Sequence, residues 1–292
     1  MTTRVSISLR SFISIGIIHR LRQALRLLVG RYVAEALREY EAFVQATTHT
    51  NDGRLTEAEI AAIRLAEEAR YDLPNYQQHL LDLQISDDLL QHPEKASAYQ
   101  QAALLCLPLL ENRALGIRSM ANVGTRVDIV CSYLAQKFPD VQFISIDLPG
   151  NLAAINSGLP QSRNWSFASG YALDLFERQA VTADLVLFSN TCEIIRNQEL
   201  HQYFAALSKF ARYIVLNEQW WPVHKATHFL RVLKPEDIDP DRSLPGGKMS
   251  TYQHNYPKIL ARSGFEVLSS EITDAPDSKF WLVKIVARNK TL

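Results

Sequence analysis

The stretch SMANVGTRVDIVCSYLAQKFPDVQFISIDLPG, from Ser119 to Gly150, decides the fold of this chain. It opens with a β-rich run, turns at a glycine, continues with helical spacing and closes with a second β-rich run. This order predicts a strand, a turn, a helix and a parallel strand, the unit that binds nucleotides in many α/β proteins. Two turn positions that usually hold glycine carry Arg126 and Asp128 instead. The stretch therefore raises the question whether this is a working site with unusual chemistry or the remnant of one.

Beyond this stretch the same alternation continues towards the C-terminus. Short β-rich runs occupy residues 116–122, 141–147, 165–169, 183–190 and 212–217, and segments with helical spacing, such as 127–138 and 199–211, separate most of them. Strands that alternate with helices predict an α/β fold, a Rossmann-like and mostly parallel sheet with helices on both faces. Residues 264–272 and 279–287 form two further strands, and the link between them is too short for a parallel crossover. We therefore expect an antiparallel hairpin at the C-terminus.

The first third of the chain has a different period. Apolar and aromatic residues recur at three- and four-residue spacing from Leu21 to Phe43, and residues 96–113 form a more apolar helical segment that Pro108 is expected to interrupt. We therefore expect a helical N-terminal region over residues 1–112 and an α/β domain over residues 113–292. The helical region is expected to cap the site or to form a homodimer.

The residues before Glu35 form a basic amphipathic segment, in which arginines and apolar residues are interleaved and no acidic residue occurs. Three interpretations stay open. The segment packs as a helix on the α/β domain or on a second subunit, it makes a peripheral contact with an anionic membrane surface, or it is a targeting presequence.

The composition argues against several classes of function. Lys and Arg total 31, as do Asp and Glu, so the net charge of the 292 residues is zero and provides no global basic field for nucleic acid. The three cysteines, Cys106, Cys131 and Cys192, are scattered without a CxxC pair. This argues against a zinc site or a disulfide framework and favours the reducing cytoplasm. No apolar run approaches the roughly 20 residues of a membrane-spanning helix.

A parallel βα core that ends in an antiparallel hairpin, with ARSGFEV (residues 261–267) leading into it, resembles the class I S-adenosylmethionine-dependent methyltransferases. The resemblance covers roughly residues 115–292 and not the N-terminal helices. It implies S-adenosylmethionine as cofactor and methyl transfer to an oxygen or nitrogen of a small-molecule substrate. The NxGxRxD loop is also similar to that of sugar O-methyltransferases.

Two other functions stay open beside this one. A methyltransferase-like domain could bind a ligand or partner without catalysis, and the glycine-poor loop favours this alternative. A nicotinamide-dependent oxidoreductase is disfavoured by the terminal hairpin and the missing glycines.

The loop after the first strand is the first part of the expected cofactor site. The family has an acidic residue and then glycines at alternate positions, where this chain has Asn122, Gly124, Arg126 and Asp128, with Thr125 beside the glycine. Gly124 lets the backbone pass close to a ligand, and the helix that follows offers free N–H groups to the ligand carboxylate. Arg126 would add a charge-assisted bond to that carboxylate, or its side chain would fill the pocket.

The end of the second strand provides the next candidates. Asp147 lies 23 positions after Gly124, at the carboxyl end of the neighbouring strand, which suits contact with ribose hydroxyls. In the family this position does bind the ribose, and Leu148 follows it in the expected cofactor site. The alternative for Asp147 is a turn or capping role.

Two further loops are expected to contribute. The family places its adenine contacts after the third strand, which makes Ser169, Gly170 and Tyr171 candidates. Asn190 and Thr191 end the fourth strand, at the sheet edge where α/β proteins bind ligands. Ordinary loop capping is the alternative for both segments.

The catalytic candidates lie after the fifth strand. Methyl transfer from a sulfonium is an in-line displacement, so the enzyme mainly aligns the acceptor and removes its proton. Glu218 at the carboxyl end of the strand and His224 beyond it are candidate general bases. Trp220 and Trp221 would stack on a sugar or aromatic acceptor, and residues 245–260 would form a lid over it. The alternatives are packing roles for these side chains and a plain surface connection.

Overall fold

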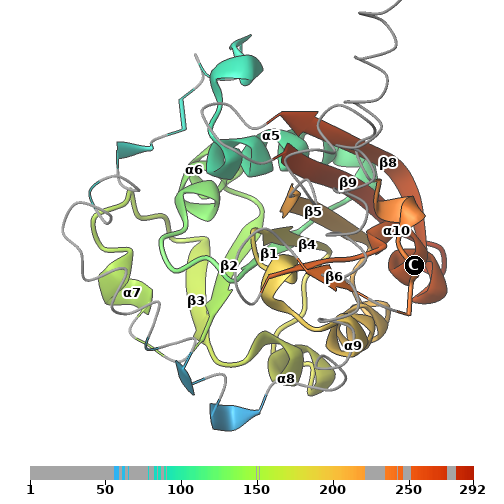
Figure 1. The fold of residues 1–292 in the computed structure, drawn as a ribbon. Coiled ribbons are helices and arrows are strands. Elements are labelled where there is room, and N and C mark those ends of the chain that lie inside the picture. The colour runs from blue at the N-terminus through green and yellow to red at the C-terminus, as the bar shows by residue number, and fades with distance from the viewer. Residues whose placement is uncertain are drawn as a thin grey trace, which may run out of the picture.

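The computed structural model of the chain describes residues 56–58, 61–62, 65, 78, 82–83, 85–86, 89, 91–148, 150, 152–220, 234–241, 243–245, 251–274 and 281–292. Seven strands form one sheet, in the order β3-β2-β1-β4-β5-β9-β8 (Figure 1). The strands of this sheet are β1 (Ser119–Val123), β2 (Gln142–Asp147), β3 (Trp165–Ser169), β4 (Leu185–Ser189), β5 (Tyr213–Trp220), β8 (Phe265–Asp274) and β9 (Trp281–Asn289). Two short strands, β6 (Leu244–Pro245) and β7 (Tyr252–Gln253), pair separately.

The direction of the strands confirms the expected fold class. Strands β1 to β5 are parallel to one another, whereas β9 lies antiparallel between β5 and β8. The mostly parallel Rossmann-like sheet and its antiparallel C-terminal hairpin are therefore both present. The order of the strands reverses at β1, which has β2 on one side and β4 on the other.

Helices cover both faces of the sheet (Figure 1). Helices α5 (Ala98–Glu111) and α6 (Ile129–Lys137) share one apolar cluster with side chains of β1, β2, β4 and β5. Helices α8 (Ala172–Glu177), α9 (Asn197–Leu207) and α10 (Tyr256–Arg262) share a second cluster on the opposite face. Among the elements whose bounds the structure describes, the other helical ones are α7 (Leu152–Ile155), η1 (Pro93–Lys95), η2 (Arg113–Leu115), η3 (Cys192–Ile194) and η5 (Pro235–Asp237). The sheet thus lies between two layers of helices, each packed on one of its faces.

Helix α5 differs in one respect from the expectation. Ser97 and Gln100 form a capping box at its start, but Pro108 does not interrupt the helix, which continues to Glu111. Proline removes one backbone donor and here lies in the last helical turn, where Asn112 N still donates to the carbonyl oxygen of Pro108 at 3.3 Å. A proline this close to the end leaves little helix to break.

Most of the N-terminal region lies outside the described residues. This applies to the helix expected from Leu21 to Phe43 and to the basic segment before Glu35. Helix α5 packs against α6 and β5, so it belongs to the core of the α/β layers. A capping or dimerising role for residues 1–112 stays a prediction. None of the described helices combines the length and apolar character that crossing a membrane requires.

Candidate functional site

A cavity of about 80 Å³ lies at the carboxyl ends of β1, β2 and β4, where the strand order reverses. Ligands of open α/β sheets bind at such a point, because adjacent loops diverge to opposite faces there. The lining residues from the loops after the strands are Gly124, Asp147, Leu148, Gly170, Tyr171, Asn190 and Thr191. All seven were expected from the sequence to contact a cofactor. Their role in binding stays a prediction.

Six apolar or aromatic residues complete the lining and were missed by the sequence reasoning. They are Val123, Ile146, Ala172, Ile194, Ile195 and Tyr203. Such residues follow the same pattern as core positions, so the sequence alone carries no signal that separates them from the core. Four expected residues do not line the cavity: Asn122, Thr125, Arg126 and Ser169.

Gly124 brings two loops into close contact. Its φ is +77°, and its N–H donates to the carbonyl oxygen of Ile146 at 2.8 Å. A Cβ on this residue would lie 2.4 Å from Thr191 Oγ1. Thr191 Oγ1 in turn donates to the carbonyl oxygen of Val123 at 2.8 Å. Glycine therefore suits this position for two reasons, the left-handed backbone and the lack of room for a Cβ beside Thr191.

Asp147 lies at the wall of the cavity, nearly buried at 6% exposure. Its Oδ1 accepts a hydrogen bond from Leu148 N at 2.6 Å, and its carbonyl oxygen accepts one from Gly170 N at 2.8 Å. Ser169 Oγ instead accepts from Gly150 N at 3.0 Å and donates to the carbonyl oxygen of Gly150 at 3.2 Å. Asp147 and Gly170 thus form one wall, while Ser169 fastens the loop behind it.

Neither of the two side chains that replace glycine after β1 lines the cavity. The Asp128 carboxylate is fully buried and accepts from Asn122 Nδ2 at 2.9 Å, Cys131 N at 2.8 Å and Ser145 Oγ at 2.5 Å. Burial raises the pKa of Asp128, and these hydrogen bonds act in the opposite direction. The Arg126 side chain is buried as well and reaches the loop after β2, where its Nη2 lies 3.7 Å from the place that a Cβ on Gly150 would occupy.

Asn190 is the polar side chain best placed to meet a ligand. Its φ of 55° is left-handed, which asparagine adopts more readily than most residues. Both polar atoms of its side chain are buried without a hydrogen-bond partner among the described residues, although its backbone N–H donates to the carbonyl oxygen of Asn217 at 3.0 Å. Buried amides are normally hydrogen-bonded, so an unpartnered one at a cavity wall points to a ligand.

Glu218, one of the two expected general bases, is fully buried and is not among the lining residues. Its Oε2 accepts from Thr191 N at 2.9 Å and from Glu193 N at 3.4 Å. Burial, and secondly the charge of Glu193, raise the pKa of Glu218 to about 8. These contacts favour a positioning role over proton transfer with a substrate. The other candidate, His224, lies outside the described residues, as does Trp221.

Trp220 is buried, and its ring centroid lies 6.4 Å from that of Tyr256 on α10. Trp220 is therefore a core side chain, and its buried position does not support the expected stacking on an acceptor. His254, in the segment expected to form a lid, is buried too, with Nε2 at 3.2 Å from the carbonyl oxygen of Cys192. Burial lowers the pKa of His254 to about 4, so its ring is neutral at neutral pH.

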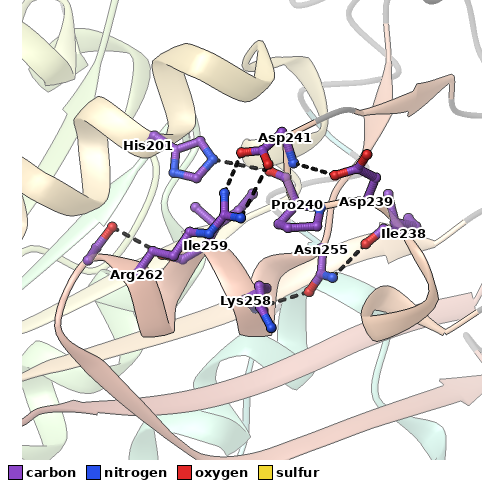
Figure 2. A network of polar contacts seen from close by, with 10 residues as sticks. His201, Ile238, Asp239, Pro240, Asp241, Asn255, Lys258, Ile259 and Arg262 are labelled. Atoms are coloured by element: carbon purple, nitrogen blue, oxygen red, sulfur yellow. Dashed lines mark hydrogen bonds and ion pairs between the residues drawn. The ribbon is translucent and has the colours of Figure 1, made fainter.

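Residues 235–241 are fastened to α9 and α10 by polar contacts (Figure 2). His201 Nε2 on α9 lies 3.1 Å from the carbonyl oxygen of Pro240, and Arg262 on α10 forms an exposed ion pair with Asp241. These contacts fix residues 235–241 against α9 and α10.

The same segment is also fastened from the start of α10. Asn255 Nδ2 donates to the carbonyl oxygen of Ile238 at 2.6 Å, and Asn255 Oδ1 accepts from Lys258 N at 3.0 Å, which caps the helix (Figure 2).

Among the described residues, no group of histidine, cysteine, aspartate and glutamate side chains is arranged to hold a metal ion.

The comparison with solved structures bears on the fold. Magnesium protoporphyrin IX methyltransferase (ChlM) from Synechocystis PCC 6803, solved with bound SAM, is similar over 82% of this chain and 100% of that chain, with a TM-score of 0.52 and 13% identity. The fold is that of a class I methyltransferase. At this identity the likeness concerns the fold alone. No protein-family model and no curated protein matches the sequence.

Two other solved structures are similar at lower TM-scores. The N-terminal domain of EvdMO1, solved with SAH bound, matches with a TM-score of 0.41 and 13% identity over 64% of this chain and 80% of that chain. The pyocyanin biosynthetic protein PhzM matches with a TM-score of 0.43 and 17% identity over 65% of this chain. The match spans 55% of the length of PhzM.

Proposed function

We propose that this protein is an S-adenosylmethionine-dependent methyltransferase that acts on an oxygen or nitrogen of a small molecule. The observation that carries the proposal is the cavity at the point where the strand order reverses. Seven residues that the sequence singled out for cofactor contact meet there, on a fold shared with the whole length of ChlM. The bound cofactor would supply an activated methyl group on a sulfonium.

The residues around the cavity fit such a ligand in chemistry. Asp147 would accept hydrogen bonds from the ribose hydroxyls, and Tyr171 would lie against the adenine. The unpartnered amide of Asn190 offers both a donor and an acceptor, and Gly124 leaves room for close approach of the backbone. Arg126 would approach the amino-acid carboxylate from the side of the β2 loop.

The size of the cavity sets a condition on binding. Small-molecule pockets have volumes from roughly 300 Å³ upwards, whereas this cavity measures about 80 Å³. Binding of the cofactor therefore requires side chains at the wall to move. Tyr171 is suited to this, since it is only partly buried, whereas Tyr203, whose ring centroid lies 6.3 Å from that of Tyr171, is held in the core.

Calorimetric titration tests the proposal directly. We expect heat of binding with S-adenosylmethionine and with S-adenosylhomocysteine, and none with NAD, which serves as control. Absence of binding by both sulfur ligands would overturn the proposal, and binding of NAD alone would indicate an oxidoreductase.

A second candidate function is binding of a ligand or partner without catalysis, and the small cavity together with the replaced glycines favours it. The two functions differ in one measurable respect. A catalyst forms S-adenosylhomocysteine from S-adenosylmethionine when a mixture of sugar, phenolic and amine acceptors is added, whereas a non-catalytic domain forms none. Homodimer formation, a peripheral membrane contact and a cytoplasmic location stay predictions, as does the expectation that nucleic acid is not a partner.

A further inference from the structure

Residues 190–193, which we call the β4 loop, form a concavity of backbone amides next to the cavity. Asn190 is left-handed and Thr191 follows with φ −123° and ψ −43°, so that successive N–H groups converge. Thr191 N and Glu193 N both donate to Glu218 Oε2, and the N–H of Cys192 also stabilises the charged form of this carboxyl group. A side chain of β5 therefore occupies a site of the kind that usually holds an anion.

The β4 loop connects this carboxyl group to the cavity. Asn190 and Thr191 line the cavity, whereas Glu218 lies behind them and does not. Thr191 Oγ1 is bonded to the carbonyl oxygen of Val123, and its side chain lies where a Cβ on Gly124 would clash. One carboxyl group thus fixes the loop after β4 against the loop after β1.

We propose that Glu218 is a positioning residue, whose carboxyl group holds the β4 loop so that Asn190 and Thr191 face a ligand in the cavity. Its effect on ligand affinity rests on the function proposed above. The effect on the loop itself does not, because the hydrogen bonds exist without a ligand.

The surroundings of Glu218 determine which form of the side chain holds the loop. Its neighbours with titratable groups are Glu193 and Cys192 on η3 and Tyr256 on α10, and each of them interacts electrostatically with the carboxyl group. None of these groups supplies a positive charge. The Glu218 Oε1 atom is buried without a partner among the described residues. Burial and the charge of Glu193 outweigh the three amides of the β4 loop and favour the neutral acid, so ionisation at higher pH favours a displaced loop that lets water reach the charge.

The test measures the affinity of 5′-methylthioadenosine, which lacks the amino-acid part of the cofactor, between pH 7 and 9. In the wild type the affinity should fall with rising pH, by about tenfold at most, as Glu218 ionises. In Glu218→Gln, which stays neutral and keeps a carbonyl acceptor, the affinity should stay level. Glu193→Gln is the matched control. It removes the like charge, so the fall should begin at lower pH.

Amide hydrogen exchange at Thr191 and Glu193 gives a readout without ligand. The protection of these amides, taken relative to Glu218→Gln at the same pH, should decrease in the wild type towards pH 9. Glu218→Ala should lose the protection at every pH if it folds, and Glu218→Gln should restore it. Level protection and level affinity in the wild type, or an equal fall in Glu218→Gln, would overturn the inference. If no adenosyl ligand binds but the amides behave as stated, the proposed function fails and the positioning role stands.

Discussion

Replacement of Gly124 by alanine tests how closely the loops after β1 and β4 cross. The added Cβ would lie 2.4 Å from Thr191 Oγ1 and 2.6 Å from Thr191 Cγ2, distances that real Cβ atoms essentially never show. Thr191 cannot simply turn away, because Oγ1 donates to the carbonyl oxygen of Val123 and the backbone N–H donates to Glu218. The backbone at Gly124 is also left-handed, with a φ of +77°.

Two separate terms add to the expected loss of stability. Overfilling a packed region destabilises by about 1–3 kcal/mol. A left-handed conformation at a residue with a Cβ costs about 1–2 kcal/mol. The unfolding free energy of Gly124→Ala should therefore be lower than that of the wild type by about 2–5 kcal/mol, a large part of the stability of an ordinary domain.

Urea denaturation measures this loss, and Gly264→Ala separates its two terms. Gly264 has a φ of +91°, and a Cβ there would meet nothing within 4 Å, so its replacement introduces backbone strain without a clash. The difference between the two variants should be about 1–3 kcal/mol, which is the steric term.

A double-mutant cycle identifies the residue that causes the clash. Thr191→Ala removes Oγ1 and Cγ2 and leaves only the Cβ of residue 191, 3.0 Å from the added Cβ. In this background Gly124→Ala should therefore lose most of its excess destabilisation over Gly264→Ala. A Gly124→Ala variant as stable as Gly264→Ala, or one that Thr191→Ala does not relieve, would refute the close crossing of the two loops.

Four other predictions concern the site and its supports. Asp147→Ala should weaken binding of S-adenosylhomocysteine by about 1.5–3 kcal/mol in calorimetry with little change in melting temperature, and unaltered affinity would remove Asp147 from the site. Arg126→Ala should weaken binding of S-adenosylmethionine but not of 5′-methylthioadenosine, whereas tighter binding of both would mean that the arginine fills a disused pocket. The pKa of Glu218, raised by burial to about 8, makes its contribution to the unfolding free energy complete below the ordinary value of 4.5 and lost as the pH rises through 8. The difference corresponds to about 5 kcal/mol, which Glu218→Gln should abolish in urea titrations from pH 4 to 9. Asn255→Ala, which removes a buried helix cap, should lower the free energy of unfolding by about 1–2 kcal/mol. Asp241→Ala, which breaks an exposed ion pair, should leave the urea midpoint nearly unchanged, and equal losses in the two variants would contradict the greater weight given to the cap.

The sheet was predictable because its signals are local. Each parallel strand is a short β-rich run between segments of helical spacing, and the short link before Trp281 excludes a parallel crossover. Gly124 and Asp147 were predictable for the same reason. Gly124 follows the end of one predicted strand and Asp147 is the last residue of the next, and the carboxyl ends of adjacent parallel strands lie at one edge of a sheet.

The environment of the acidic side chains was not predictable from sequence. Glu218 was expected at the end of a strand, as Asp147 was, but β5 continues to Trp220. The Glu218 side chain is buried behind the β4 loop, whereas Asp147 lines the cavity. The difference depends on the conformation at Asn190, which turns three amides towards β5. Local sequence predicts that a loop begins at such a position, but not which way its N–H groups point.

The loop after β1 can lose two of its usual glycines because only one of the three positions needs a left-handed backbone. Among the described residues other than glycine, only Gln179 and Asn190 have positive φ, so Arg126 and Asp128 adopt conformations open to any side chain. Asp128 turns inward and caps α6. Asn156 fixes the backbone on both sides, since its Oδ1 accepts from Asp128 N at 2.8 Å and its Nδ2 donates to the carbonyl oxygen of Arg126 at 2.7 Å. The position that does need glycine, Gly124, keeps it. The replaced glycines are therefore compatible with a ligand in the cavity, because neither side chain lines it and that of Asp128 caps α6.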